Sequence, residues 1–180
     1  FNITWAGVYG GTKSASGSIS VAAKTSYTIK YNANGGSGAP GSQTKWAGTN
    51  IKLSTTKPTR TGHTFQGWST ANDSTVEYAA GATYSANASG TLYAVWKADT
   101  HKVTYNANGG SGAPATQTKT YGTILKLSTT KPTRTNYTFK GWGTSPNATV
   151  PAYQPGDQYG ADEDITLYAI WELAYTPPRI

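Results

Sequence analysis

The sequence predicts a mainly β protein built from two small modules in tandem. Two observations carry this prediction. The second half of the chain repeats the first at an offset of 74 residues, and apolar residues within each half alternate with polar ones, as in half-buried strands. No long helical periodicity is present, although residues 42–47 leave room for a short helix, so an α+β fold stays open.

The repeat consists of sequence blocks that return in the same order. Tyr31–Pro40 recurs unchanged as Tyr105–Pro114, and Lys52–Arg60 recurs as Lys126–Arg134. The offset becomes 75 near Pro151, where one residue is inserted. Because this period exceeds the roughly 20–50 residues of solenoid units, each copy is predicted to close its own core.

The repeat divides the chain into four predicted parts. Residues 27–98 form module 1 and residues 99–173 form module 2, with a short linker at residues 97–100. Residues 1–26 contain a strand-like start and a Ser/Gly/Ala-rich stretch, which we interpret as the end of a preceding domain. Residues 174–180 form a Pro-rich tail that cannot extend a sheet.

The strands of module 1 follow from alternation and from turn residues. Tyr27, Ile29 and Tyr31 alternate with polar residues, as do Ile51 and Leu53. The Asn-Gly-Gly that follows the first strand ends it with strong turn chemistry, and the Lys-Pro-Thr-Arg block is a loop because proline withholds a ladder donor. The expected strands span residues 27–31, 51–53, 64–68 and 91–96, each with a counterpart in module 2.

Both copies contain the same five motifs in the same order. They are Tyr-x-Ala-Asn-Gly-Gly, Pro-Thr-Arg, Thr-Phe-x-Gly-Trp, Gly-x-x-Tyr and Thr-Leu-Tyr-Ala-x-Trp. This order resembles the Listeria–Bacteroides repeat, a family similar to the B-repeat of listerial internalins, over residues 27–171. The resemblance implies a compact β-grasp-like sheet. It also implies a secreted or wall-attached bacterial protein without enzymatic activity, in which such units act as spacers, adhesion modules or co-receptor contacts.

Six large aromatic residues recur at matching positions and are the predicted core of the two modules. A chain poor in Leu and Ile but rich in Tyr and Trp is expected to build its core from rings, although twinned Trp faces could also stack on sugars. Trp5 and Trp46 have no duplicate and are the candidates for exposed aromatic contacts. The predicted core residues are Phe65, Trp68, Trp96, Phe139, Trp142 and Trp171.

The formal net charge of +7 indicates a preference for anionic partners such as wall polymers or acidic glycans. Basic residues recur in both copies and could form a stripe that contacts a polyanion in a salt-dependent way, or a merely solubilising face. Nucleic acid is not an expected partner, because no base-stacking residues accompany the stripe. The residues of this candidate stripe are Lys52, Lys57, Arg60, Lys126, Lys131 and Arg134.

The sequence predicts no catalytic, cofactor or metal site. It contains no Cys, and neither His63 nor His101 has the spacing of a triad or of metal ligands. The acidic run at residues 162–164 lacks the pattern of a calcium loop, and Asn-Gly-Gly lacks the Lys and helix of a phosphate loop. No apolar run of roughly 18 residues is present, so no membrane span is expected.

Three functions fit these observations. The first is a non-catalytic extracellular segment that acts as a spacer or adhesion module of a bacterial surface or secreted protein. The second is a structural or decoration protein of a bacteriophage virion, and the third is a glycan-binding accessory module. In each case the expected partners are proteins, bound through edge strands or the N-terminal segment, or a cell-wall polymer or glycan.

Overall fold

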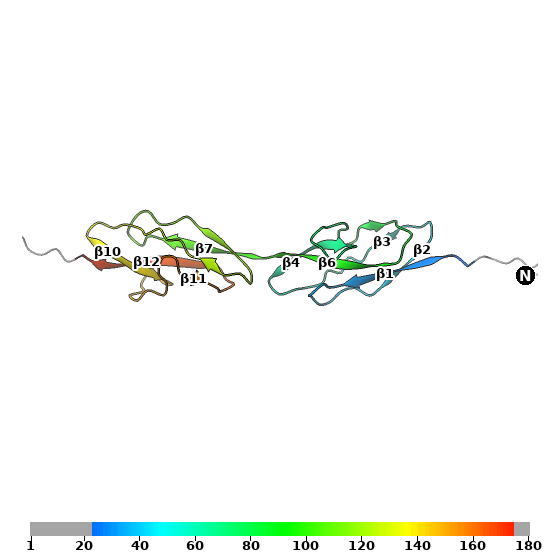
Figure 1. Cartoon of the computed structure of the whole chain (residues 1–180), viewed down its shortest axis with the longest axis horizontal. Helices are drawn as coiled ribbons and strands as arrows, with labels where there is room; N and C mark the ends of the chain where they lie inside the picture. Colours follow the sequence, from blue (N-terminus) through cyan, green and yellow to red (C-terminus); the bar gives the residue numbers. More distant parts are fainter. Residues whose placement is uncertain (1–22, 175–180) are drawn as a thin grey trace, which may run out of the picture.

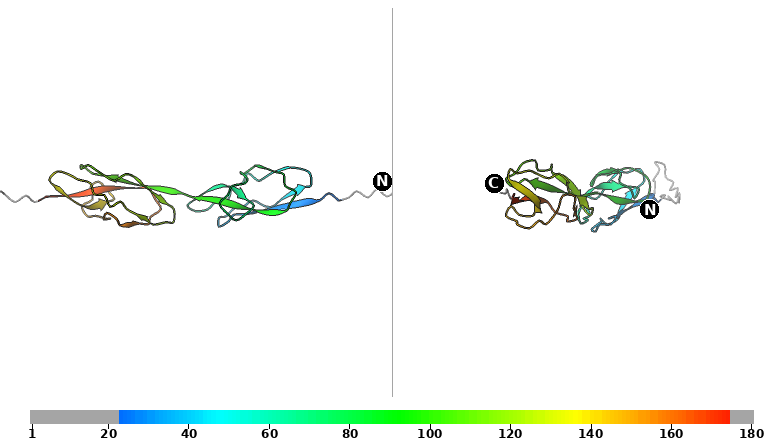
Figure 2. Two further views of the ribbon diagram at one scale, coloured as in Figure 1. Left: turned by 45° about the horizontal axis from the view of Figure 1, so that its top comes forward. Right: turned by 60° about the vertical axis from the view of Figure 1, so that its left-hand side comes forward.

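The structure is a computed structural model that describes residues 23–174. These residues form twelve strands and no helix, arranged as two modules that follow one another along the long axis (Figure 1). The two further views separate the same two lobes, joined by one continuous stretch of chain (Figure 2). The mainly β prediction is therefore confirmed, while the β-grasp likeness remains a prediction.

Module 1 is built on a four-stranded mixed sheet in the order β2-β1-β6-β4. The first and last long strands lie side by side in parallel, and the outer two strands pair with them antiparallel. A separate two-stranded ribbon joins β3 to β5. The bounds are β1 (Ser26–Asn32), β2 (Gln43–Trp46), β3 (Ile51–Lys52), β4 (His63–Ser69), β5 (Thr83–Tyr84) and β6 (Gly90–Ala98).

Module 2 repeats this plan strand for strand. Its sheet has the order β10-β12-β7-β8, with β7 and β12 parallel, and its ribbon joins β9 to β11. The bounds are β7 (Thr100–Asn106), β8 (Gln117–Thr120), β9 (Leu125–Lys126), β10 (Tyr137–Gly143), β11 (Gln158–Tyr159) and β12 (Ile165–Leu173).

Glycines set two local features of each module. After β1, Asn34 and Gly35 both have positive φ, as a tight turn of the Asn-Gly type requires, and Gly36 N–H closes the turn on Ala33 O. In β4 the register shifts between Phe65 and Gly67, which is a β-bulge. A Cβ on Gly67 would lie 2.8 Å from the Tyr78 carbonyl oxygen, so glycine lets the next segment bond to the outer edge of β4.

The structure differs from the sequence predictions in two places. Residues 43–46, within the segment that left room for a helix, form the edge strand β2, because Lys45 fits the inward-facing position of a period-two pattern. The prediction of a four-residue linker is also wrong. Strand β6 continues to Ala98 and β7 begins at Thr100, so Asp99 alone separates the two strands.

Candidate functional sites at the module junction and on module 2

The predicted core rings lie inside or against the core of each module. Trp68 and Trp142 have no exposed surface, so neither offers a face to a ligand. Phe65 contacts Trp68 edge-on, with the ring centroids 5.0 Å apart, and Trp96 in the same manner at 5.8 Å. Phe139 makes the equivalent contacts with Trp142 and Trp171 in module 2. Trp96 and Trp171 are partly buried, and each donates its indole N–H to the Asn-Gly turn, at Ala33 O and Ala107 O.

The two unduplicated tryptophans have different outcomes. Trp46 ends the edge strand β2 and is 46% exposed, so its ring is available for contacts. Trp5 lies outside the described residues.

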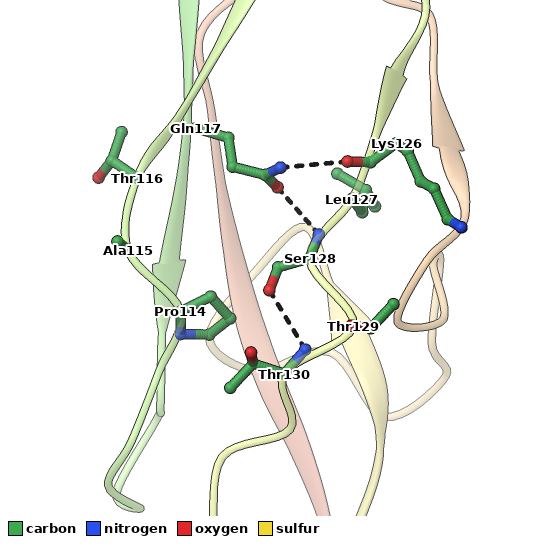
Figure 3. A pocket seen from close by; sticks show the side chains of 9 residues that line it. All are labelled: Pro114, Ala115, Thr116, Gln117, Lys126, Leu127, Ser128, Thr129 and Thr130. Carbon is green, nitrogen blue, oxygen red and sulfur yellow. Dashed lines mark hydrogen bonds between the residues drawn. The ribbon is translucent and has the colours of Figure 1, made fainter.

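The candidate basic residues lie on a short strand, in a Pro loop and against a turn, and these places recur in the two modules. Lys52 lies on β3 and its Nζ donates to Thr83 Oγ1 at 2.8 Å. Lys57 and Lys131 are exposed in the Pro loops. Arg60 and Arg134 instead lie against the Asn-Gly turns. Figure 3 shows that the side chain of the remaining one, Lys126, extends away from the hollow that its backbone lines.

This hollow is bounded by a hydrogen-bonded clamp around Gln117 (Figure 3). Gln117 Oε1 accepts from Tyr105 Oη at 2.6 Å and from Ser128 N at 2.9 Å, and its Nε2 donates to Lys126 O at 3.1 Å. Burial raises the pKa of the Tyr105 phenol, with an opposing effect from its bond to Ser128 N. Because these polar groups bond to one another, the clamp holds β8 against the segment that begins with β9. The lining residues of the hollow are Pro114, Ala115, Thr116, Gln117, Lys126, Leu127, Ser128, Thr129 and Thr130.

Sequence reasoning missed two buried lysines that occupy equivalent positions. Lys45 is fully buried and donates to Asn87 Oδ1 at 2.6 Å, while Lys119 is 1% exposed and forms a salt bridge with Asp162. The Lys119 hydrogen bond is the main reason that the pKa of Asp162 lies below its usual value. The signal in the sequence is the position of each lysine on the inward side of its edge strand.

The junction between the modules is a single residue with both backbone groups fixed. Asp99 N donates to Gly62 O of module 1, and Asp99 O accepts from Tyr121 N of module 2, each at 2.9 Å. Its carboxylate accepts from Thr64 Oγ1 at 2.7 Å. One backbone bond holds Asp99 to module 1 and the other holds it to module 2, so the junction is not a free hinge.

An aromatic ring closes the junction from the side. The Tyr121 ring contacts the His63 ring edge-on with centroids 5.7 Å apart. A Cβ on Gly62 would lie 2.3 Å from the same ring, so the contact depends on glycine. The equivalent residues at the outer ends of the modules are Ala47 and Asn136. The ring contact between Tyr121 and Gly62 is thus specific to the inner junction.

Some classes of site are not found among residues 23–174. No group of three or more His, Asp or Glu side chains there is arranged to hold a metal ion. The same residues include no helix of the length and apolarity that would cross a membrane.

This chain matches one protein family and is similar to two curated proteins. The family model of the Listeria-Bacteroides repeat domain matches residues 27–95 and again residues 101–170. A protein of Evansella cellulosilytica, whose name describes it as a Gly-rich membrane protein, is 35% identical over 130 residues. A second protein of that organism, whose name describes it as a membrane protein, is 31% identical over 149 residues.

The chain corresponds to only a small part of these relatives. The two alignments cover 63% and 81% of this chain but 14% and 22% of the relatives. No solved structure matches significantly. The two family matches together cover more than half of the chain, in the order and with the motifs seen in the sequence. The chain belongs to the Listeria-Bacteroides repeat domain family and contains two tandem copies of the domain.

Proposed function

We propose that this chain is a non-catalytic spacer segment of a bacterial surface or secreted protein. The two modules extend along one axis and hold the ends of the described chain far apart (Figure 1). The observation that carries the proposal is the junction, where Asp99 bonds to both modules and the Tyr121 ring rests on Gly62. A spacer needs such a junction, because a flexible linker would let the two modules fold back on each other.

The family match and the two relatives support a place at the bacterial surface. The matched family consists of repeat domains, and both relatives are named as membrane proteins of which this segment would form a small part. The short edge strands β2 and β8 are the places where a protein partner could add a strand to either sheet. A role in a bacteriophage virion would use the same stiffness, and the same test of stiffness applies to it.

The stiffness can be measured by single-molecule energy transfer between the two ends. The chain has no Cys, so cysteines introduced at Lys24 and Glu172 can be labelled specifically. A spacer gives one narrow distribution of end-to-end distances at all salt concentrations. A Gly-Ser insertion after Asp99 should broaden the distribution and shorten its mean, because it frees one side of the junction. The same insertion in the exposed loop at Ser74 is the control.

The proposal fails if the unmodified chain already gives a distribution as broad as that of the insertion variant. The role itself can then be tested on a bacterial surface. A binding domain displayed beyond the two modules should reach a bead-bound target through a polymer brush more often than the same domain on a flexible linker of equal residue number. Equal capture by the two displays would contradict a spacer role.

A further inference from the structure

We propose that Arg134 is the centre of a binding site for carboxylate-bearing polysaccharides, that is, polymers with uronic acid residues. The site lies on module 2, away from the junction contacts, and goes beyond the spacer role. Two separate hollows share Arg134 as a lining residue. One is lined by backbone and hydroxyl groups, and the other mainly by apolar side chains together with the amides of Asn108 and Asn147.

The guanidinium of Arg134 is held in place from two sides. Its Cζ lies 3.9 Å from the centroid of the Tyr137 ring, a stacked cation–π geometry. On another side the Asn-Gly turn approaches so closely that a Cβ on Gly109 would lie 3.4 Å from the same Cζ. An arginine that is already ordered loses less side-chain entropy when it binds a carboxylate through its planar fork.

The charge of Arg134 is not neutralised within the described part of the chain. None of the salt bridges among residues 23–174 involves this arginine. The acid next to Trp171 in β12 is Glu172, and it is paired with Lys140 at 2.8 Å. An oxyanion that reaches Arg134 therefore meets a guanidinium that no described carboxylate neutralises.

The two hollows suit the two parts of a sugar acid. In the first, the hydroxyl oxygens of Ser111 and Thr133 lie 3.4 Å apart beside Gly109 and Gly110, and they can bond to carboxylate or hydroxyl oxygens. The second hollow, which Arg134 also lines, includes Pro146, Asn147, Ile170 and Trp171 among its lining residues. Apolar edges beside an amide match the C–H face and hydroxyls of a pyranose ring.

Module 1 contains the same arginine in a poorer setting, which makes it an internal comparison. Arg60 lies against Gly35 as Arg134 lies against Gly109. However, the residue equivalent to Tyr137 is His63, whose ring is engaged with Tyr121. The residue equivalent to Asn147 is Asp73, whose carboxylate would repel an anionic ligand. We therefore assign the site to module 2 and expect little binding at Arg60.

The test measures binding of polygalacturonate oligomers by titration calorimetry at low salt. Arg134→Gln should weaken binding about tenfold, the loss expected for one charge-assisted pair of hydrogen bonds. Arg134→Lys should also weaken it, because a lysine keeps the charge but not the planar fork. Tyr137→Ala should give a smaller loss, since it removes only the stacking that positions the guanidinium. Circular dichroism confirms that each variant is folded.

Matched variants separate the site from general electrostatics. Lys131→Gln removes an equal charge three residues away, and Arg60→Gln removes the arginine of module 1, so both should bind nearly as well as the unmodified chain. Equal losses in Lys131→Gln and Arg134→Gln would overturn the proposal, as would stronger binding of polyglycerol phosphate than of polygalacturonate. Neutral dextran should not bind. Arg134→Gln should leave the end-to-end distances unchanged, so this proposal and the spacer role can fail separately.

Discussion

The Tyr121 ring occupies the space that a β-carbon on Gly62 would need, with three ring carbons 2.3 Å from the ideal Cβ position. The two residues come from different modules and form the side wall of the junction. At the outer ends of the pair, the same two positions hold Ala47 and Asn136. At the junction the large Tyr121 faces the small Gly62. At the outer ends the position of Tyr121 holds a small alanine and the position of Gly62 holds a larger asparagine.

This difference between the junction and the outer ends suggests a mutation that should affect the junction alone. Gly62→Asn keeps a residue that tolerates positive φ, because Asn136 has φ 62° at the equivalent position and Gly62 has φ 65°. The new side chain must therefore act through its collision with Tyr121. We expect a broader end-to-end distance distribution and faster hydrogen exchange at the Asp99 and Tyr121 amides, with little change inside either sheet.

Added to Gly62→Asn, the change Tyr121→Ala should restore the narrow distance distribution and the slow amide exchange at the junction. The double variant Gly62→Asn with Tyr121→Ala reproduces the residue pair of the outer ends and removes the collision, so the two changes should not be additive. Additive effects in the double-mutant cycle would show that the ring and the glycine do not interact. The exchange rates of β1 and β10 amides serve as the reference for global stability.

Much of the architecture was predictable because repetition constrains it. Blocks such as Tyr31–Pro40 that return unchanged must form the same structure twice, and period-two alternation identified β1 and β6 directly. Strand β2 was harder, since its four residues contain a lysine that points inward and a tryptophan that is half exposed. Its pattern is the reverse of a normal amphipathic strand, which is why a short helix remained possible.

The junction and the Arg134 hollows could not be predicted from sequence spacing. Tyr121 and Gly62 are 59 positions apart, and only the continuation of β6 into β7 through Asp99 brings them together. Arg134 and Trp171 line the same hollow because β12 lies beside β7 in the sheet, and Trp171 bonds to the turn after β7 that Arg134 contacts. Sequence could supply the residue types and their repetition, but contacts between loops depend on the packed backbone.

The two buried lysines offer a swap between modules. Asn87 shows that a neutral amide oxygen satisfies Lys45, so Asp162→Asn should be tolerated by Lys119 better than Asp162→Ala, which leaves the buried amine without that acceptor. In the reverse direction, Asn87→Asp should stabilise module 1. Module-specific hydrogen exchange of the amides in β1 and β7 measures each effect. A larger loss from Asp162→Asn than from Asp162→Ala would contradict this account.

Acid should weaken module 2 before module 1. The pKa of Asp162 is lowered in the folded chain, mainly by the Lys119 hydrogen bond, so its contribution is present above the unfolded pKa and is lost as the pH falls through the folded value. Asn87 does not titrate. Lowering the pH below about 4, the usual range of Asp, should therefore increase exchange in β8 more than in β2. Asp162→Asn should abolish this difference, and its persistence would assign the acid sensitivity to other carboxylates.

The final prediction concerns the close approach of the Asn-Gly-Gly turn to its neighbours. A Cβ on Gly110 would lie 2.5 Å from Thr133 O and 2.5 Å from Trp171 Cζ2, and the backbone oxygen cannot move without breaking the bond from Ser111 N. We expect Gly110→Ala to destabilise module 2 by about 1–3 kcal/mol, the usual cost of overpacking. Gly160→Ala is the control, since nothing lies within 4 Å of its Cβ position. Urea unfolding followed by Trp fluorescence measures both variants. Equal midpoints would mean that the turn can shift without cost. The guanidinium of Arg134 packs against the same turn, so it would then lack a rigid contact that keeps it ordered.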